Sequence, residues 1–163
     1  MLLLFMVASG ASVKVQDSRQ RICFSYKSDA VVSGDEVLAA DCDSSDQKQS
    51  NWAVTTLSNS QGSQVVQFCI QGTSLCIGAN KNRQNRVSRV TLVAQDSSDT
   101  AQQWTIDSLN LKTSYFNVLS NECLQVAGGT RRGTITTGSC TGNKRQQWII
   151  SSNFTKQFDR LIL

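Results

Sequence analysis

Three tryptophans recur at similar intervals along the chain, each shortly after a glutamine. The later two stand in matching triplets, Gln102-Gln103-Trp104 and Gln146-Gln147-Trp148, and the first stands in Gln49-Ser50-Asn51-Trp52. A large indole is normally buried, and a neighbouring glutamine amide can bind the backbone of a preceding loop. The pattern predicts a repeated unit in which each tryptophan enters the core. The core motif residues of this unit are Trp52, Gln102, Trp104 and Trp148.

Three cysteines recur in register with these tryptophans. Cys23, Cys76 and Cys123 each lie in a short apolar segment, and they precede the next tryptophan by 29, 28 and 25 positions. The intervals from one such cysteine to the next are 53 and 47 residues. A fixed order of unlike landmarks that is found three times indicates internal repeats.

The segments between these landmarks are typical of β-strands. Residues 64–70, 89–93 and 133–137 are rich in β-forming side chains, and clusters of Ser, Asn, Asp and Gly separate such segments. No long segment keeps a helical period. Many short strands with closely spaced turns predict an all-β barrel or sandwich, and three repeats suit a barrel with threefold pseudo-symmetry.

Cys…Cys…Gln-x-Trp, repeated three times, resembles the ricin-type lectin family of β-trefoils, and the similarity covers about residues 20–163. The resemblance implies a disulfide-stapled β-trefoil with pseudo-threefold symmetry. We expect one trefoil domain over residues 13–163, with repeats at about 20–66, 67–116 and 117–163.

The resemblance also implies a disulfide framework, because the family usually links the first strand of a repeat to a later strand of the same repeat. The middle repeat departs from this pattern, since Ala94 and Gln95 stand where the partner of Cys76 is expected. Six cysteines permit fifteen pairings, so the choice rests on the repeat and not on spacing. The expected bridges are Cys23–Cys42, Cys69–Cys76 and Cys123–Cys140.

The first residues predict secretion. Residues 1–8 are apolar and small residues follow, so residues 1–12 are expected to be a signal peptide or its remnant; the alternative is a buried first strand. An even number of cysteines agrees with an oxidising compartment. Asn153 begins a glycosylation triplet. No run of eighteen apolar residues exists, so no transmembrane segment is expected.

The net charge of +4 is unevenly distributed. Residues 1–75 contain five basic and seven acidic side chains, whereas residues 76–148 contain nine basic and four acidic ones. An electrostatic partner is therefore expected to be anionic and to contact the later part of the chain. No nucleic acid is expected, because aromatics for base stacking are not interleaved with these cations. The candidate anion-binding residues are Lys81, Arg83, Arg86, Arg89, Arg131, Arg132 and Lys144.

Catalysis is disfavoured because the chain contains no histidine. This absence excludes nucleophile systems that use histidine as the base and zinc sites with histidine ligands. Two pairs of aspartates precede the first two tryptophans, but both stand in Ser-Asp turns, where aspartate usually caps the backbone. We therefore expect no enzyme, no cofactor and no metal site. These pairs are Asp43 with Asp46 and Asp96 with Asp99.

In the family, each sugar pocket uses an aspartate two residues after the first cysteine, an aromatic before the second cysteine and a polar residue before Gln-x-Trp. The aspartate positions hold Ser25, Gly78 and Gln125. The aromatic positions hold Ala40, roughly Leu92, and Gly138. The polar positions hold Gln49, Ala101 and Arg145. Because no repeat keeps both the aspartate and the aromatic, an ordinary galactose site is not expected.

The third repeat keeps the largest polar set, and cations lie close to it in the sequence. Arginine suits sulfate and phosphate because its planar fork binds them through two hydrogen bonds. Our hypothesis is a secreted lectin module that binds acidic or sulfated glycans or glycoproteins. The alternative is a trefoil that has lost sugar binding and serves as a protein-interaction, adhesive or structural subunit, including a homo-oligomer. The candidate carbohydrate-binding residues are Gln125, Asn143, Arg145 and Gln146.

Overall fold

The computed structural model describes residues 12–43, 45–81, 88–107, 113–127 and 133–152. Two sequence-predicted features lie outside these ranges: the signal segment up to residue 11 and the glycosylation triplet at Asn153. Four candidate anion-binding residues also lie outside them, namely Arg83, Arg86, Arg131 and Arg132.

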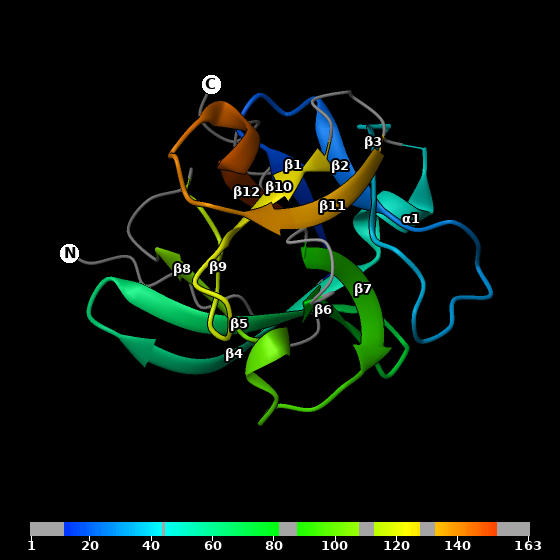
Figure 1. Ribbon diagram of the computed structural model, residues 1–163. Coiled ribbons are helices and arrows are strands. Elements are labelled where there is room, and N and C mark those ends of the chain that lie inside the picture. Colours follow the sequence, from blue (N-terminus) through cyan, green and yellow to red (C-terminus); the bar gives the residue numbers. More distant parts are fainter. Residues whose placement is uncertain (1–11, 44, 82–87, 108–112, 128–132, 153–163) are drawn as a thin grey trace, which may run out of the picture.

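The described residues form twelve strands that are joined in one antiparallel network (Figure 1). Short helical turns precede the motif tryptophans. The strands are β1 (Val13–Asp17), β2 (Ile22–Ser25), β3 (Leu38–Asp41), β4 (Trp52–Ser60), β5 (Ser63–Ile70), β6 (Leu75–Lys81), β7 (Ser88–Ala94), β8 (Trp104–Asp107), β9 (Phe116–Asn117), β10 (Cys123–Val126), β11 (Gly133–Gly138) and β12 (Trp148–Ser152). The helical turns are α1 (Gln47–Ser50), η1 (Thr100–Gln102) and η3 (Lys144–Gln146).

The strand register repeats three times. Each motif tryptophan faces a residue of the next repeat's first strand, and each landmark cysteine faces a residue of its own repeat's first strand. The tryptophan pairs are Trp52 with Ile70, Trp104 with Asn117 and Trp148 with Asp17. The cysteine pairs are Cys23 with Gln16, Cys76 with Cys69 and Cys123 with Phe116. The repeats are thus the strand groups β1–β4, β5–β8 and β9–β12.

Pairing between β1 and β12 closes the barrel. These strands match over five positions, from Val13 opposite Ser152 to Asp17 opposite Trp148. The first and last described strands are therefore neighbours in space, and the three repeats surround one interior. This arrangement is a β-trefoil, as the repeated landmarks predicted.

All three repeats contribute to a single apolar core. Trp52, Trp104 and Trp148 are fully buried. The ring of Phe24 contacts two of these indoles edge-on, with centroids 5.8 Å from Trp52 and 4.9 Å from Trp148. Phe68 stacks on Tyr115 at 5.4 Å, which joins the second repeat to the third.

Three disulfides link strands of the barrel: two are those that the resemblance implies, and the third is the bridge expected between the remaining two cysteines. Two of them link the first-cysteine strand to the end of the strand that follows it, and the middle one instead joins β5 to β6. The reason is positional, because Cys69 lies directly opposite Cys76, whereas Gln16 and Phe116 occupy the equivalent places. The bridges are Cys23–Cys42, Cys69–Cys76 and Cys123–Cys140.

Candidate functional site

A buried glutamine in each repeat ties down the loop beside the expected sugar pocket. Its side-chain oxygen accepts from a backbone N–H at 2.7 to 3.1 Å, and its amide nitrogen donates to a carbonyl two residues earlier at 2.8 to 3.0 Å. The three sets are Gln49 with Asp43 and Asp41, Gln102 with Asp96 and Ala94, and Gln146 with Thr141 and Ser139.

These ties correct the alignment of the first repeat. Gln49 is the tie glutamine and does not occupy the polar pocket position, which belongs to Lys48. The error has a simple cause: Ser50 is an extra residue between the tie glutamine and Trp52. The extra residue goes with an α-helical turn, α1, where the other two repeats have 3-10 turns.

The strand register also corrects the aromatic position of the second repeat. Ala40 faces Cys23 and Gly138 faces Cys123, and the residue that faces Cys76 is Val93. Leu92, which sequence reasoning placed there approximately, is fully buried in the core.

The pocket position of the second repeat is filled by Val93. A Cβ atom at Gly78 would lie 2.9 Å from the Val93 Cγ2 atom. Real Cβ atoms do not approach a carbon so closely, so an aspartate at this position requires that valine to move. The second repeat therefore lacks both the chemistry and the space of a sugar pocket.

The third repeat presents a different arrangement, in which the Gln125 amide covers Gly138. A Cβ atom at Gly138 would lie 2.5 Å from the Gln125 Nε2 atom, so the amide occupies the place where an aromatic side chain would begin. Gln125 Oε1 accepts from the tie glutamine, Gln146, at 2.9 Å. Gln125 is half-buried and borders the exposed turn η3.

The four candidate carbohydrate-binding residues differ in their exposure and in how many of their hydrogen-bonding groups the protein already uses. Gln146 is buried, and its oxygen accepts twice from Thr141 while its nitrogen donates to Ser139 and Gln125, which uses all its hydrogen-bonding capacity. Asn143 is exposed but caps η3 through the Arg145 N–H at 2.9 Å. Its amide nitrogen donates to the Thr141 hydroxyl. Arg145 is exposed and forms no ion pair with the described part of the chain.

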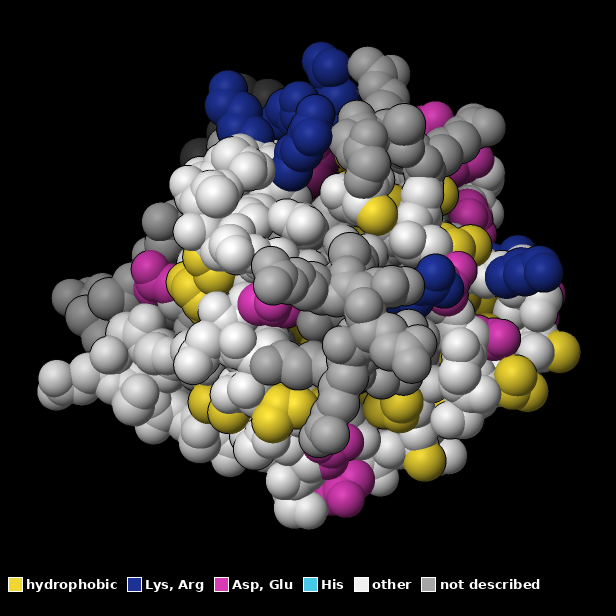
Figure 2. Space-filling view, viewed as in Figure 1, with side chains coloured by type: hydrophobic (Ala, Val, Ile, Leu, Met, Phe, Trp, Pro, Cys, Tyr) yellow, Lys and Arg dark blue, Asp and Glu magenta, His cyan; other side chains and the backbone are white. Residues whose placement is uncertain are grey.

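Cations gather around η3. Lys144 and Arg145 are exposed on this turn, and the N–H of Ser18 binds the carbonyl of Gln147 at 2.8 Å, which brings the β1–β2 turn beside it. That turn and the residue after it add Arg19, whose guanidinium binds the Asp17 carboxylate at 3.3 Å, and the exposed Arg21. Figure 2 shows Lys and Arg side chains grouped at the top of the view, over the region where Figure 1 shows β10, β12 and β2.

The remaining candidate anion-binding residues are placed elsewhere in the described sheet. Lys81 ends β6, and Arg89 lies on β7. The Arg89 guanidinium binds the Glu36 carboxylate at 2.9 Å, so a carboxylate already offsets its charge.

The aspartate pairs that precede the first two tryptophans cap turns. Asp46 accepts from the Lys48 N–H at 3.0 Å and Asp99 from the Ala101 N–H at 2.9 Å. Backbone and side-chain hydrogen bonds from Ser45 lower the pKa of Asp43. The same two kinds of bond from Ser98, with the hydroxyl contributing most, lower the pKa of Asp96.

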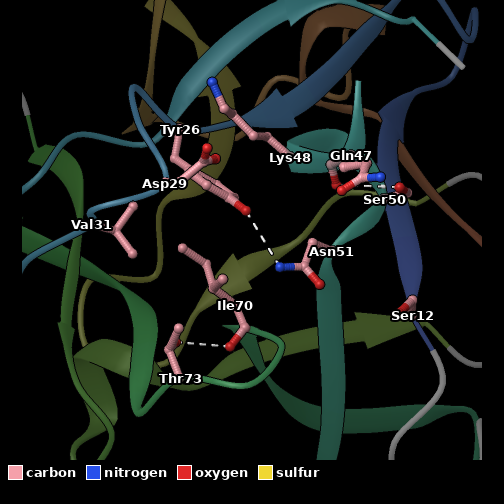
Figure 3. A pocket seen from close by; sticks show the side chains of 10 residues that line it. All are labelled: Ser12, Tyr26, Asp29, Val31, Gln47, Lys48, Ser50, Asn51, Ile70 and Thr73. Carbon is pink, nitrogen blue, oxygen red and sulfur yellow. Dashed lines mark hydrogen bonds between the residues drawn. The ribbon is translucent and has the colours of Figure 1, made fainter. Parts of the chain in front are cut away.

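A hollow that sequence reasoning missed lies where the first repeat meets the second (Figure 3). It has a volume of about 390 Å³. Its lining joins side chains from four separate segments, so no local motif reveals it. The signal in the sequence is that Tyr26, Asn51 and Ile70 differ from the residues at the same positions of the other repeats. The lining side chains used below are Tyr26, Asp29, Val31, Lys48, Asn51 and Ile70.

Within the described part of the chain, none of the helices has the length and apolar character that crossing a bilayer requires. The barrel and the three tie glutamines define a β-trefoil of three equivalent repeats.

The sequence matches the model of the ricin-type beta-trefoil lectin domain over residues 11–148. The chain belongs to this family. No curated protein matches the sequence significantly.

Solved structures with the same fold are distant in sequence. The designed threefold-symmetric protein ThreeFoil is 15% identical, with a TM-score of 0.68 over 85% of this chain and 96% of that one. The C-half of the earthworm R-type lectin, solved with GalNAc, is 11% identical, with a TM-score of 0.62 over 88% and 99%. A GlcNAcα1-4Gal-releasing endo-β-galactosidase from Clostridium perfringens is 12% identical, with a TM-score of 0.64 over 87% of this chain and 32% of that one.

Proposed function

We propose that this chain is a secreted, non-catalytic carbohydrate-binding module that recognises anionic glycans, including sulfated ones, through its third repeat. The observation behind the proposal is the exposed pair Lys144 and Arg145 beside the half-buried amide of Gln125. Membership of a lectin family supports binding of a carbohydrate. The positive charge of Lys144 and Arg145 supports an acidic carbohydrate as the ligand.

The chemistry of the pocket position favours a charged group over a neutral galactose. The carboxylate that would accept from sugar hydroxyls is replaced by Gln125, and the aromatic by Gly138. Arg145 presents a planar fork that can hold a sulfate through two hydrogen bonds. Gln125 and Asn143 can add amide contacts from either side of η3. Gln146 is omitted from this proposal because its amide is committed to the fold.

The proposal is tested with matched sulfated and desulfated glycans on an array, at about 50 mM and 500 mM NaCl. We expect the protein to bind the sulfated member of a pair and to lose most of that binding at the higher salt, because exposed charges are screened. Arg145→Ala should weaken binding by about tenfold, and Arg145→Lys should recover only part of it because the fork is lost.

Lys27→Ala is the matched control, since it removes an exposed cation from the first repeat. Its affinity should stay within about twofold of the parent. Binding that ignores both salt and Arg145, or no binding to any sulfated glycan, contradicts the proposal.

A protein-interaction or structural role, including self-association, is the second candidate. Two observations favour it: each repeat lacks the aspartate and the aromatic of the family pocket, and Phe116 and Leu119 are large apolar side chains exposed on β9 and in the turn after it. Sedimentation of the purified protein tests self-association. Under this candidate, Phe116→Ser reduces the association and Arg145→Ala does not.

A further inference from the structure

The hollow in the first repeat lies at the boundary between repeats where the residue opposite the motif tryptophan is apolar. Asp17, Ile70 and Asn117 occupy equivalent places, each opposite a motif tryptophan. Asn117 is fully buried, and its amide nitrogen donates to the Ala101 carbonyl at 2.8 Å and weakly to the Gln103 carbonyl. Asp17 is also buried, and its carboxylate accepts from the backbone N–H groups of Arg21 and Ile22 and from the Arg19 guanidinium, all in its own repeat. The side chain of Ile70 has no polar atom that could form such hydrogen bonds, and it lines the hollow.

Two further residues at this boundary turn polar groups toward the hollow. Tyr26 takes the place of Ala79 and Val126, as their equal spacing from the landmark cysteines shows. Asn51 takes the place of Gln103 and Gln147, whose longer amides bind the carbonyls of Ser97 and Gly142. The shorter Asn51 instead donates to the Tyr26 hydroxyl at 3.4 Å, and Figure 3 shows both groups facing the hollow.

The lining combines balanced charge with apolar surface. Asp29 is exposed and Lys48 is half-exposed, and neither forms an ion pair with a described residue. In Figure 3 the Lys48 amine and the Asp29 carboxylate lie toward the same end of the hollow, away from Thr73. Val31 is half-buried and contributes apolar surface, whereas Ile70 is buried and lies at the base of the hollow. One cation and one anion offset each other, so the hollow suits an uncharged ligand with several hydroxyls.

We propose that this hollow is a second binding site, which takes one neutral sugar unit such as a hexose or an N-acetylhexosamine. The volume of about 390 Å³ falls in the usual range for small-ligand sites. Asp29 accepts from sugar hydroxyls, Lys48 and the Asn51 amide bind sugar oxygens, and the apolar face of the ring lies against Val31. The site differs from the third-repeat site in position and charge, and it does not depend on it.

The test is a titration of ¹⁵N-labelled protein with the methyl glycosides of glucose, galactose, mannose, GlcNAc and GalNAc, followed by NMR. We expect at least one of them to shift the Asn51 side-chain amide and the backbone amides of Tyr26 and Val31, with a Kd of roughly 1–10 mM because the site is open and makes few contacts. This shift should persist at about 500 mM NaCl, which separates it from binding of an anionic glycan at Arg145.

Two variants test the hollow, one by placing a polar side chain in it and one by removing a carboxylate from its lining. Ile70→Asn introduces the amide side chain found at Asn117, and Asp29→Asn removes an exposed carboxylate without burdening the core. Each should weaken glycoside binding by at least fivefold, and Asp29→Asn keeps the test decisive if Ile70→Asn folds poorly. Lys27→Ala is the control, because Lys27 is exposed next to Tyr26 but does not line the hollow.

The absence of a shift with every glycoside at about 50 mM overturns the proposal. Shifts that Asp29→Asn leaves unchanged overturn it as well. Loss of sulfated-glycan binding in Arg145→Ala bears only on the third repeat, so the two proposals fail separately.

Discussion

At the scale of single residues, the three motif indoles are equivalent in burial but not in hydrogen bonding. Trp148 Nε1 donates to the Leu124 carbonyl at 2.9 Å, and Trp104 Nε1 donates to the Ile77 carbonyl at 3.3 Å. Trp52 Nε1 is buried and finds no partner among the described residues. The first repeat therefore packs its indole without the bond that orients the other two.

This difference predicts unequal costs for the same substitution. Trp148→Phe and Trp52→Phe both lose packing, but only Trp148→Phe leaves a buried carbonyl without its donor. We expect Trp148→Phe to lower the free energy of unfolding by about 1–2 kcal/mol more than Trp52→Phe. Urea denaturation at pH 7 measures both variants. Equal losses would show that the Leu124 bond adds nothing.

At the scale of elements, the strands could be predicted because repeated cysteines and tryptophans mark them. Two of the bridges could be predicted because the chain resembles a family that links cysteines within a repeat, and the third was expected between the two cysteines that remained. The pocket positions were predicted less well where a landmark is missing or displaced. In the first repeat, the pocket position Ala40 is found by counting two residues back from Cys42. In the second repeat, Gln95 stands in place of that cysteine, so the sequence had no landmark from which to locate Val93. In the first repeat, Ser50 shifts the count. The hollow was not predictable, because it depends on how four separate segments meet.

The turn α1 gives the element-scale prediction. Deletion of Ser50 restores the Gln-x-Trp spacing of the other repeats, so we expect a 3-10 turn in place of α1 and a loss below about 1 kcal/mol. Deletion of Gln103 is the contrasting variant. It removes the carbonyl that accepts from Val118 and displaces Trp104 from its register, so it should cost more than about 3 kcal/mol. Thermal unfolding compares the two, and a Ser50 deletion as damaging as that of Gln103 would contradict the proposed insertion.

At the scale of the whole molecule, two features bear on how stability depends on pH: the absence of histidine, and the two aspartates that accept hydrogen bonds from serines. No side chain with an ordinary pKa changes its charge between about pH 5.5 and 7, since histidine is the usual group that does so. The pKa values of Asp43 and Asp96 are lowered. Their contribution is therefore present above the pKa of an unfolded aspartate, near 4, and it is lost as the pH falls through the lower folded value.

We accordingly expect the urea midpoint to be constant between pH 5.5 and 7 and to fall below about pH 4. Ser98→Ala should raise the pKa of Asp96 toward its ordinary value, because the Ser98 hydroxyl is the largest cause of the shift. Carboxyl NMR titration follows this residue directly. A step in the midpoint between pH 5.5 and 7 would contradict the expectation.

The antiparallel match of Val13 with Ser152 has an architectural consequence. The beginning of the first described strand and the end of the last described strand lie side by side in the barrel. A few joining residues would link these two positions, and new ends could then be opened in a loop elsewhere without disturbing any strand pair. For the same reason, the barrel could be inserted into a loop of a host protein, because its two connections to the host would start from neighbouring positions.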